Sequence, residues 1–276
     1  MRGRTFFLLV QNTVQKEYRN KTLIFLFLFT LFILWMDQTF FDFIKDKLFQ
    51  GQTFSLFNFK LDLFYYIISS WNFLMGALLG VSCLRSDVQE GVLEEILSLP
   101  LSRINYITSR LVGTWLIVMG YYILSLLLAF LVFGYKGKGG LDFAWPLFSS
   151  LIMSSIPILA VITLGALFSL FFSRVWALLI TLLFSSFVSF SNEIFAGKYF
   201  EGLTQIKSLG QGIYAFLHTF FPHIGTFNTL SKELFGNHEL TKNLSLELVH
   251  FGLTFSLLLF ILLKRLRNME NYLDEG

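Results

Sequence analysis

The amino-acid sequence predicts an all-α polytopic membrane protein with six transmembrane helices. Of its 276 residues, 55% are hydrophobic, only 14% are charged, and the mean hydropathy is +0.66. A soluble domain of this size carries about a quarter charged residues. The hydrophobic residues also occur in long uncharged runs, and about 20 such residues are needed for one helix to cross a bilayer. Residues 1–276 are therefore expected to form a single transmembrane domain.

The first predicted element is an amphipathic helix over residues 5–20. Apolar side chains recur there every three or four residues, while polar side chains take the other face. The apolar set is Phe6, Phe7, Val10, Val14 and Tyr18, and the polar set is Gln11, Gln15, Lys16 and Arg19. Such a helix lies in the membrane interface. Two roles are open for it: a simple anchor, or an anchor that also touches a cytosolic partner.

Six predicted spans follow the interfacial helix. They cover residues 22–41, 63–84, 111–135, 146–172, 175–192 and 246–263. The fourth and fifth are separated at Ser173 and Arg174, because an arginine at the bilayer centre costs about 3 kcal/mol or more. Between the last two spans, residues 193–245 form a long outer loop with structure of its own. Within that loop, residues 206–221 are predicted to form an interfacial or re-entrant helix that stops at Pro222.

The distribution of arginine predicts the orientation. With the N-terminus inside, Lys and Arg divide 12 to 9 between the inner and outer segments, and every Arg falls inside. Basic residues are enriched in cytoplasmic loops. Both termini are therefore expected in the cytoplasm.

The inner loop after the second span carries the most specific pattern. Ser86 is a predicted N-cap with Gln89 three residues later, and Pro100 ends the helix, so the predicted helix spans residues 86–99. One face is apolar and the other acidic, comprising Val88, Val92, Leu93, Ile96 and Leu97 against Asp87, Glu90, Glu94 and Glu95. An acidic helix at the anionic inner leaflet suits a basic groove on a protein better than lipid. An ordinary solvated loop helix is the alternative.

The same loop resembles that of ABC-2 type transporter permeases. The pattern acidic-x-x-acidic-Gly-x-Leu, followed by Pro-Leu-Ser-Arg-x-x-Tyr, stands here as Asp87, Glu90, Gly91, Leu93, Pro100, Leu101, Ser102, Arg103 and Tyr106. The six spans and the basic exit at residues 264–267 are also similar to that family. The outer stretch 221–228 is similar to a Pro-Asn-x-x-x-Phe-Asn segment of a permease subgroup linked to copper-enzyme maturation and gliding motility, with His223 in place of the Asn.

This resemblance implies a half-transporter of the bacterial inner membrane. Two permease subunits would pair, as a homodimer or heterodimer, and each would dock an ABC ATP-binding subunit through the loop helix. The expected docking residues are Asp87, Glu90, Gly91, Leu93, Glu94, Leu97, Pro100 and Arg103. The chain itself would bind no cofactor, because ATP and Mg would bind in the partner. Membrane lipid and an envelope protein at the outer loop are the other expected partners.

The sequence carries no pattern of an enzyme of its own. No G-x-x-x-x-G-K-[ST] phosphate loop is present, and no H-E-x-x-H or paired catalytic group is evident. His218 and His223 share the outer loop with Glu193 and Glu201, which are ligand types for a metal, but no metal site is predicted. The single Cys83 excludes an internal disulfide. The small net charge of +3 does not indicate nucleic acid.

The transport pathway is expected to involve spans 2 and 5. Ser69 and Asn72 lie in span 2, and Ser185 and Ser189 share a face of span 5. Helix packing is the alternative role for these small polar residues. Tyr214, Phe221 and Pro222 are the expected outer gate.

Three functions are compatible with these patterns. The first is the permease subunit of an ATP-driven exporter. The second is an ATPase-coupled mechanical anchor that acts on an envelope partner. The third is a stand-alone secondary carrier, which usually needs an ionisable residue at mid-span, and the cores of spans 2 to 5 contain none.

Overall fold

A computed structural model describes residues 2–19, 56–89, 91, 102–133, 144–195, 208–236 and 243–274, and most positions from 24 to 39. Every regular element in these ranges is an α-helix. The predicted all-α class is therefore confirmed for the described part of the chain.

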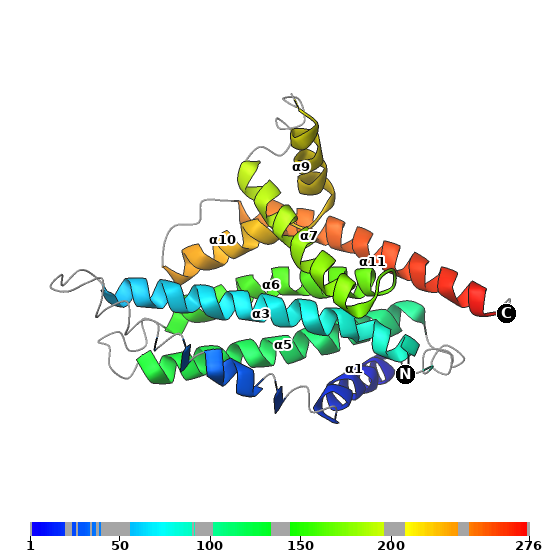
Figure 1. Ribbon diagram of the computed structural model, residues 1–276, viewed down its shortest axis with the longest axis horizontal. Helices are drawn as coiled ribbons and strands as arrows, with labels where there is room; N and C mark the ends of the chain where they lie inside the picture. Colours follow the sequence, from blue (N-terminus) through cyan, green and yellow to red (C-terminus); the bar gives the residue numbers. More distant parts are fainter. Residues whose placement is uncertain are drawn as a thin grey trace.

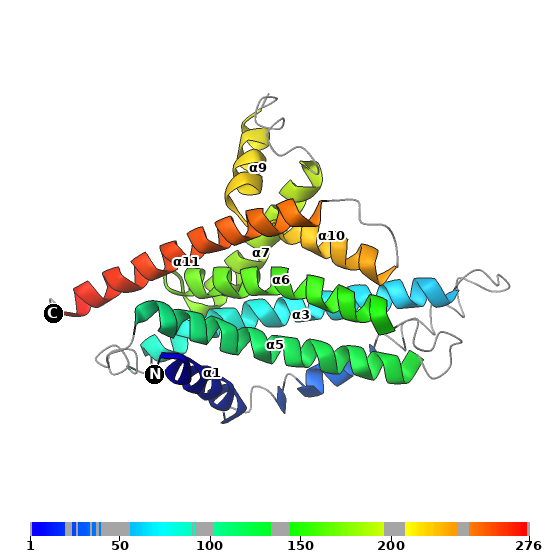
Figure 2. The same ribbon diagram turned by 180° about the vertical axis from the view of Figure 1, so that it is seen from behind.

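Three long helices form the centre of the molecule. They are α3 (Leu56–Gln89), α5 (Arg103–Phe133) and α6 (Ala144–Ser169), which lie side by side (Figures 1 and 2). Gly80 of α3 lets α6 approach closely, because a Cβ added there would lie 2.7 Å from the carbonyl oxygen of Ile162. The largest fully buried side chains lie mostly on these helices, among them Tyr106, Tyr122 and Met75.

Five described helices are long and apolar enough to cross a membrane. Four of them are α3, α5, α6 and α7 (Arg174–Ile194), and the fifth is α11 (Leu244–Asp274). They coincide with five of the six predicted spans. The first predicted span, residues 22–41, lies partly outside the described residues. Its described positions are helical and pack on α3, since Trp71 Nε1 donates to Thr30 Oγ1 at 2.9 Å.

The break predicted between the fourth and fifth spans is confirmed. α6 ends at Ser169, and α7 begins at Arg174. Arg85 of α3 holds the intervening turn, because its guanidinium donates to the carbonyl oxygens of Ser169 and Phe172. These carbonyl groups follow a helix end, where a cation is favourable.

The sequence predicted that the inner-loop helix begins at Ser86, but no helix begins at that residue. α3 continues through Ser86 and Asp87 to Gln89, and Gly91 then adopts a positive φ of 71°. A left-handed glycine just after a helix is a common terminator, because it has no Cβ to clash. Residues 92–101, which include most of the predicted helix, lie outside the described residues.

The segment between α7 and α11 contains two helices. α9 (Leu209–Phe220) ends just before Pro222, as predicted, and stands away from the central helices (Figure 1). α10 (Ile224–Phe235) was not predicted. It packs against α6 and α7 through buried side chains that include Ile224, Phe227 and Leu230. This part of the expected outer loop is therefore packed against the central helices.

A helix covers the predicted N-terminal segment and is labelled α1 (Arg2–Arg19). Val10 is buried together with Thr13, whereas Phe7 and Tyr18 are exposed. α1 packs closely on α5, because a Cβ at Gly113 would lie 2.8 Å from the Thr13 side chain. Gly113 thus admits a polar face of α1 that the apolar periodicity did not indicate.

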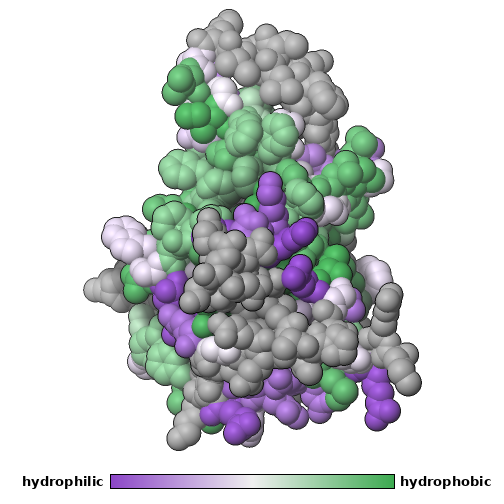
Figure 3. Space-filling model, turned by 90° about the vertical axis from the view of Figure 1, so that its right-hand side faces the viewer, coloured by the Kyte–Doolittle hydropathy of each residue, from purple (hydrophilic) through white to green (hydrophobic). Residues whose placement is uncertain are grey.

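α1 and the C-terminal end of α11 lie at the same end of the molecule as the ends of α3 and α5 that flank residues 90–101 (Figure 1). Viewed from this end, hydrophilic side chains lie around the centre and along the lower edge, with hydrophobic side chains above the centre (Figure 3).

Candidate functional site: the Asp87 cluster

A buried ionic cluster joins α1, α3 and α5, and we call Lys16, Asp87, Tyr106 and Arg110 the Asp87 cluster. Tyr106 Oη donates to Asp87 Oδ2 at 2.5 Å. The Arg110 guanidinium pairs with the same oxygen. Lys16 Nζ donates to Asp87 Oδ1 at 3.0 Å and to Ser86 Oγ at 3.2 Å. One carboxylate thus holds groups from two other helices.

Because the cluster is buried, its charged groups depend on these contacts for stability. The Asp87 side chain is 0% exposed and that of Arg110 is 5% exposed. A charge removed from water is stable only when it is paired and hydrogen-bonded. Arg110 Nη1 adds a hydrogen bond to Thr13 Oγ1 at 3.1 Å, which ties α1 to α5 a second time. The cluster therefore fixes the positions of three helices relative to one another.

Glu17 lies at the edge of this cluster. Burial raises the pKa of its carboxyl group above the ordinary value, and the nearby cations Lys16, Arg174 and Arg110 oppose that rise. A partly buried carboxyl group thus lies among the cations at this end of the molecule.

The predicted docking residues divide into two groups. Asp87 lies in α3 with its side chain buried between α1 and α5. Gly91 forms the turn that follows α3, and Arg103 is exposed at the start of α5. Glu90, Leu93, Glu94, Leu97 and Pro100 lie outside the described residues. Asp87 and Arg103 thus mark the two ends of the segment.

The predicted pathway residues contact different elements. Ser69 Oγ lies 3.3 Å from Tyr122 Oη of α5, and the Asn72 amide donates to the carbonyl of Ile68 in its own helix at 2.8 Å. Ser185 donates to Thr181 in its own helix. Ser189 lies against Gly225 of α10, where an added Cβ would be 2.6 Å from the Ser189 carbonyl oxygen. Ser69 and Ser189 thus contact neighbouring helices, whereas Asn72 and Ser185 bond within their own helices.

The predicted outer-gate residues pack on α7 or are buried. Tyr214 meets Phe190 edge to face, with ring centroids 5.8 Å apart. Phe221 meets Phe184 in the same way at 4.7 Å. Pro222 is buried. The structure therefore places all three at the junction between α9 and its neighbours.

Sequence reasoning missed a second polar cluster, formed by His218, His223 and His250 with Asn192 and Glu247. His223 Nδ1 lies 2.6 Å from Glu247 Oε2, and His218 Nδ1 lies 2.9 Å from Asn192 Oδ1. The three histidines are scattered in sequence, so their spacing gave no signal. Among the described residues, no group of three or more His, Cys, Asp or Glu side chains is placed to hold a metal ion.

Comparison with known proteins finds no matching family model, curated protein or solved structure for this chain. Any functional assignment therefore rests on the residues of the chain itself.

Proposed function

We propose that this chain is the transmembrane permease subunit of an ATP-driven ABC exporter. It pairs with a second permease subunit, and each subunit docks an ATP-binding subunit through the segment between α3 and α5. The observation that carries this proposal is the Asp87 cluster, which clamps both ends of that segment to each other and to α1.

The clamp suits a segment that receives force from a partner. Residues 90–101 leave α3 just after Asp87 and enter α5 just before Tyr106 and Arg110. Separating the two ends would leave a buried charge without its counterion, which costs about 3–5 kcal/mol. A push on the segment is therefore passed to α3 and α5 together, and through Lys16 to α1. This coupling is what a subunit without its own ATPase requires.

The proposed topology has six spans, with residues 22–41 as the first, and both termini in the cytoplasm of a bacterium. Two observations support it. Every arginine falls on one side of the predicted spans, and α1 and the end of α11 lie at the same end as the Asp87 cluster (Figure 1). ATP and Mg bind in the partner subunit. The resemblance of the loop pattern to ABC-2 type permeases gives the identity of that partner.

The docking proposal predicts that Glu94→Arg with Leu97→Asp abolishes capture of the ATP-binding subunit. The first change reverses a charge of the acidic face, and the second places a carboxylate in the apolar stripe. The full chain is expressed with the candidate ATP-binding subunit, and the amount that co-purifies is measured. A loss of at least about tenfold, equivalent to about 1.4 kcal/mol, is expected.

Glu201→Arg with Leu203→Asp is the matched control, because it makes the same two chemical changes in the segment on the opposite side of the membrane. This variant is expected to keep the wild-type amount of bound subunit. Equal capture by the docking variant and the wild type would contradict the proposal. Failure of the wild type to bind any ATP-binding subunit would favour a stand-alone carrier instead.

A further inference from the structure

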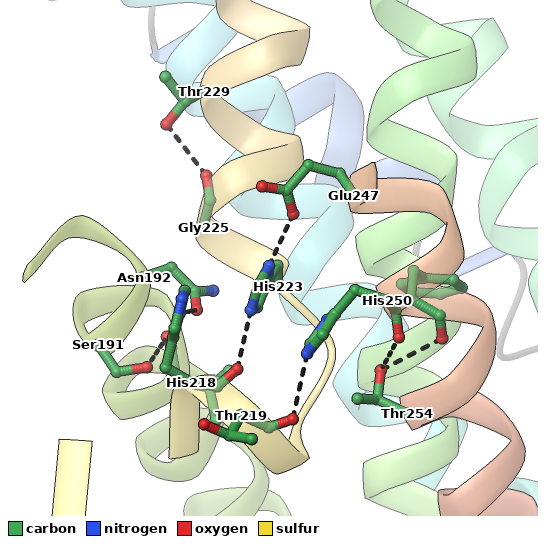
Figure 4. A network of polar contacts seen from close by, with 12 residues as sticks. Ser191, Asn192, His218, Thr219, His223, Gly225, Thr229, Glu247, His250 and Thr254 are labelled. Atoms are coloured by element: carbon green, nitrogen blue, oxygen red, sulfur yellow. Dashed lines mark hydrogen bonds and ion pairs between the residues drawn. The ribbon is translucent and has the colours of Figure 1, made fainter. Parts of the chain in front are cut away.

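Three imidazole rings from separate segments of the chain form a stack. His218 belongs to α9, His223 joins α9 to α10, and His250 belongs to α11 (Figure 4). The ring centroids of His218 and His223 are 4.2 Å apart, with an interplanar angle of 10°. Those of His223 and His250 are 3.8 Å apart, with an angle of 20°. We call these three residues the histidine stack.

Hydrogen bonding fixes the proton content of the His223–Glu247 pair. His223 Nε2 lies 2.8 Å from the His218 carbonyl oxygen, which only accepts, so Nε2 carries a hydrogen. His223 Nδ1 lies 2.6 Å from Glu247 Oε2, and one proton must lie between these two atoms. The pair is neutral overall, whether as imidazolium and carboxylate or as imidazole and carboxylic acid. A further proton on the carboxylate still leaves an oxygen that accepts from Nδ1, so this contact tolerates acid.

The outer ring of His250 does not tolerate a positive charge. Its Nε2 donates to the Thr219 carbonyl oxygen at 3.1 Å. Its Nδ1 is buried and has no hydrogen-bond partner within the described residues. A proton on Nδ1 would create an unsatisfied buried donor and a cation directly against the His223 ring. Both effects are unfavourable at a site where the His223 side chain is 0% exposed.

The surroundings of the stack offer little compensation. Among the described side chains, α9 contributes His218, and α11 contributes Glu247 and His250. α7 contributes the uncharged Asn192, which accepts from His218, and α6 contains no charged residue. Glu247 is the one anion that these hydrogen bonds and ion pairs bring to the stack, and it is already bound to His223. A positive charge on His250 is therefore relieved by separating its ring from that of His223.

We propose that the histidine stack is an acid-released latch that holds the connection between α9 and α10 against the first turns of α11. At neutral pH the stack is closed, with the His223–Glu247 pair at its centre. Protonation of the flanking His250 ring opens it and separates α9 from α11. The latch does not depend on the docking of an ATP-binding subunit.

Distance measurement between spin labels tests the latch in the full chain. Cysteines replace Leu209 of α9 and Val249 of α11, which are exposed, whereas the native Cys83 is buried and stays unlabelled. The protein is titrated in lipid nanodiscs from about pH 8 to about pH 5, on either side of the ordinary histidine pKa of about 6.5. A longer distance is expected to appear in acid, with a midpoint below about 6.5, and to disappear on return to the starting pH.

The variant His218→Phe with His250→Phe keeps a stack of three rings but removes both flanking protonation sites. It is expected to stay closed at about pH 5, on the acid side of the ordinary histidine pKa. His238→Phe removes the one other histidine of the chain and is expected to follow the wild type. The proposal is wrong if the wild-type distance is the same at both pH values. Opening that does not reverse, or equal opening of the double variant, would also overturn it.

Discussion

Asp87→Asn is expected to lower the stability of the protein more than any other conservative change at the Asp87 cluster. The substitution removes the anion that holds Arg110, whose side chain is 5% exposed. Loss of one partner of a buried ion pair costs about 3–5 kcal/mol, because the other charge stays buried and uncompensated. The Tyr106 hydroxyl loses its charged acceptor as well. Thermal unfolding of the purified protein in detergent measures the effect.

Lys16→Met is the graded control at the same cluster. The Lys16 side chain is 19% exposed, so water solvates it partly and the loss of its contact with Asp87 has a smaller effect. A cost of about 1 kcal/mol or less is expected, as for ion pairs that reach the surface. If Asp87→Asn unfolds at the wild-type temperature, or if Lys16→Met is the more damaging change, the buried cluster does not hold these helices together.

Gly80→Ala is expected to destabilise the packing of α3 on α6. The added Cβ would lie 2.7 Å from the carbonyl oxygen and 2.8 Å from the Cα of Ile162. Both atoms belong to the backbone, so the two helices must separate to admit it. Overpacking of this kind costs about 1–3 kcal/mol, and the upper part of that range is expected here. The unfolding temperature and the yield of folded protein report the loss.

Gly120→Ala separates this steric effect from the general effect of replacing a helical glycine. Apart from its own helix, no described residue has an atom within 4 Å of a Cβ added at Gly120 in α5. Alanine in a helix is favoured over glycine by about 0.5–1 kcal/mol, so this variant is expected to match or exceed the wild-type stability. Equal losses at Gly80 and Gly120 would show that the close approach of α3 and α6 is not what limits the substitution.

Local chemistry made the helical elements predictable. Apolar runs located the five described spans, and Arg174 separated the fourth from the fifth because a charge is expensive at the bilayer centre. Pro222 predicted the end of α9 for a similarly local reason, since proline cannot continue a helix. Each of these features depends on residues that are near one another in sequence.

The polar clusters depend on residues that are far apart in sequence. From the local sequence, Asp87 is expected in the inner loop. Its contacts with Lys16 and Arg110, from two other helices, permit its burial in α3. α10 was not predicted because its polar Thr226 and Ser231 are buried only through contacts with other helices. Ser231, for example, donates to the Ser150 carbonyl of α6 at 2.8 Å. The histidine stack likewise joins three elements that no sequence spacing connects.

Affinity purification of the full chain from its native membranes, at native abundance, tests the central claim most directly. The proteins that co-purify are identified by mass spectrometry, and ATP hydrolysis by the purified material is measured. The proposed function predicts a stoichiometric ATP-binding subunit with a phosphate loop, together with ATP hydrolysis that this subunit supplies. Recovery of the folded chain with no ATP-binding subunit and no ATP hydrolysis would contradict the assignment as an exporter permease.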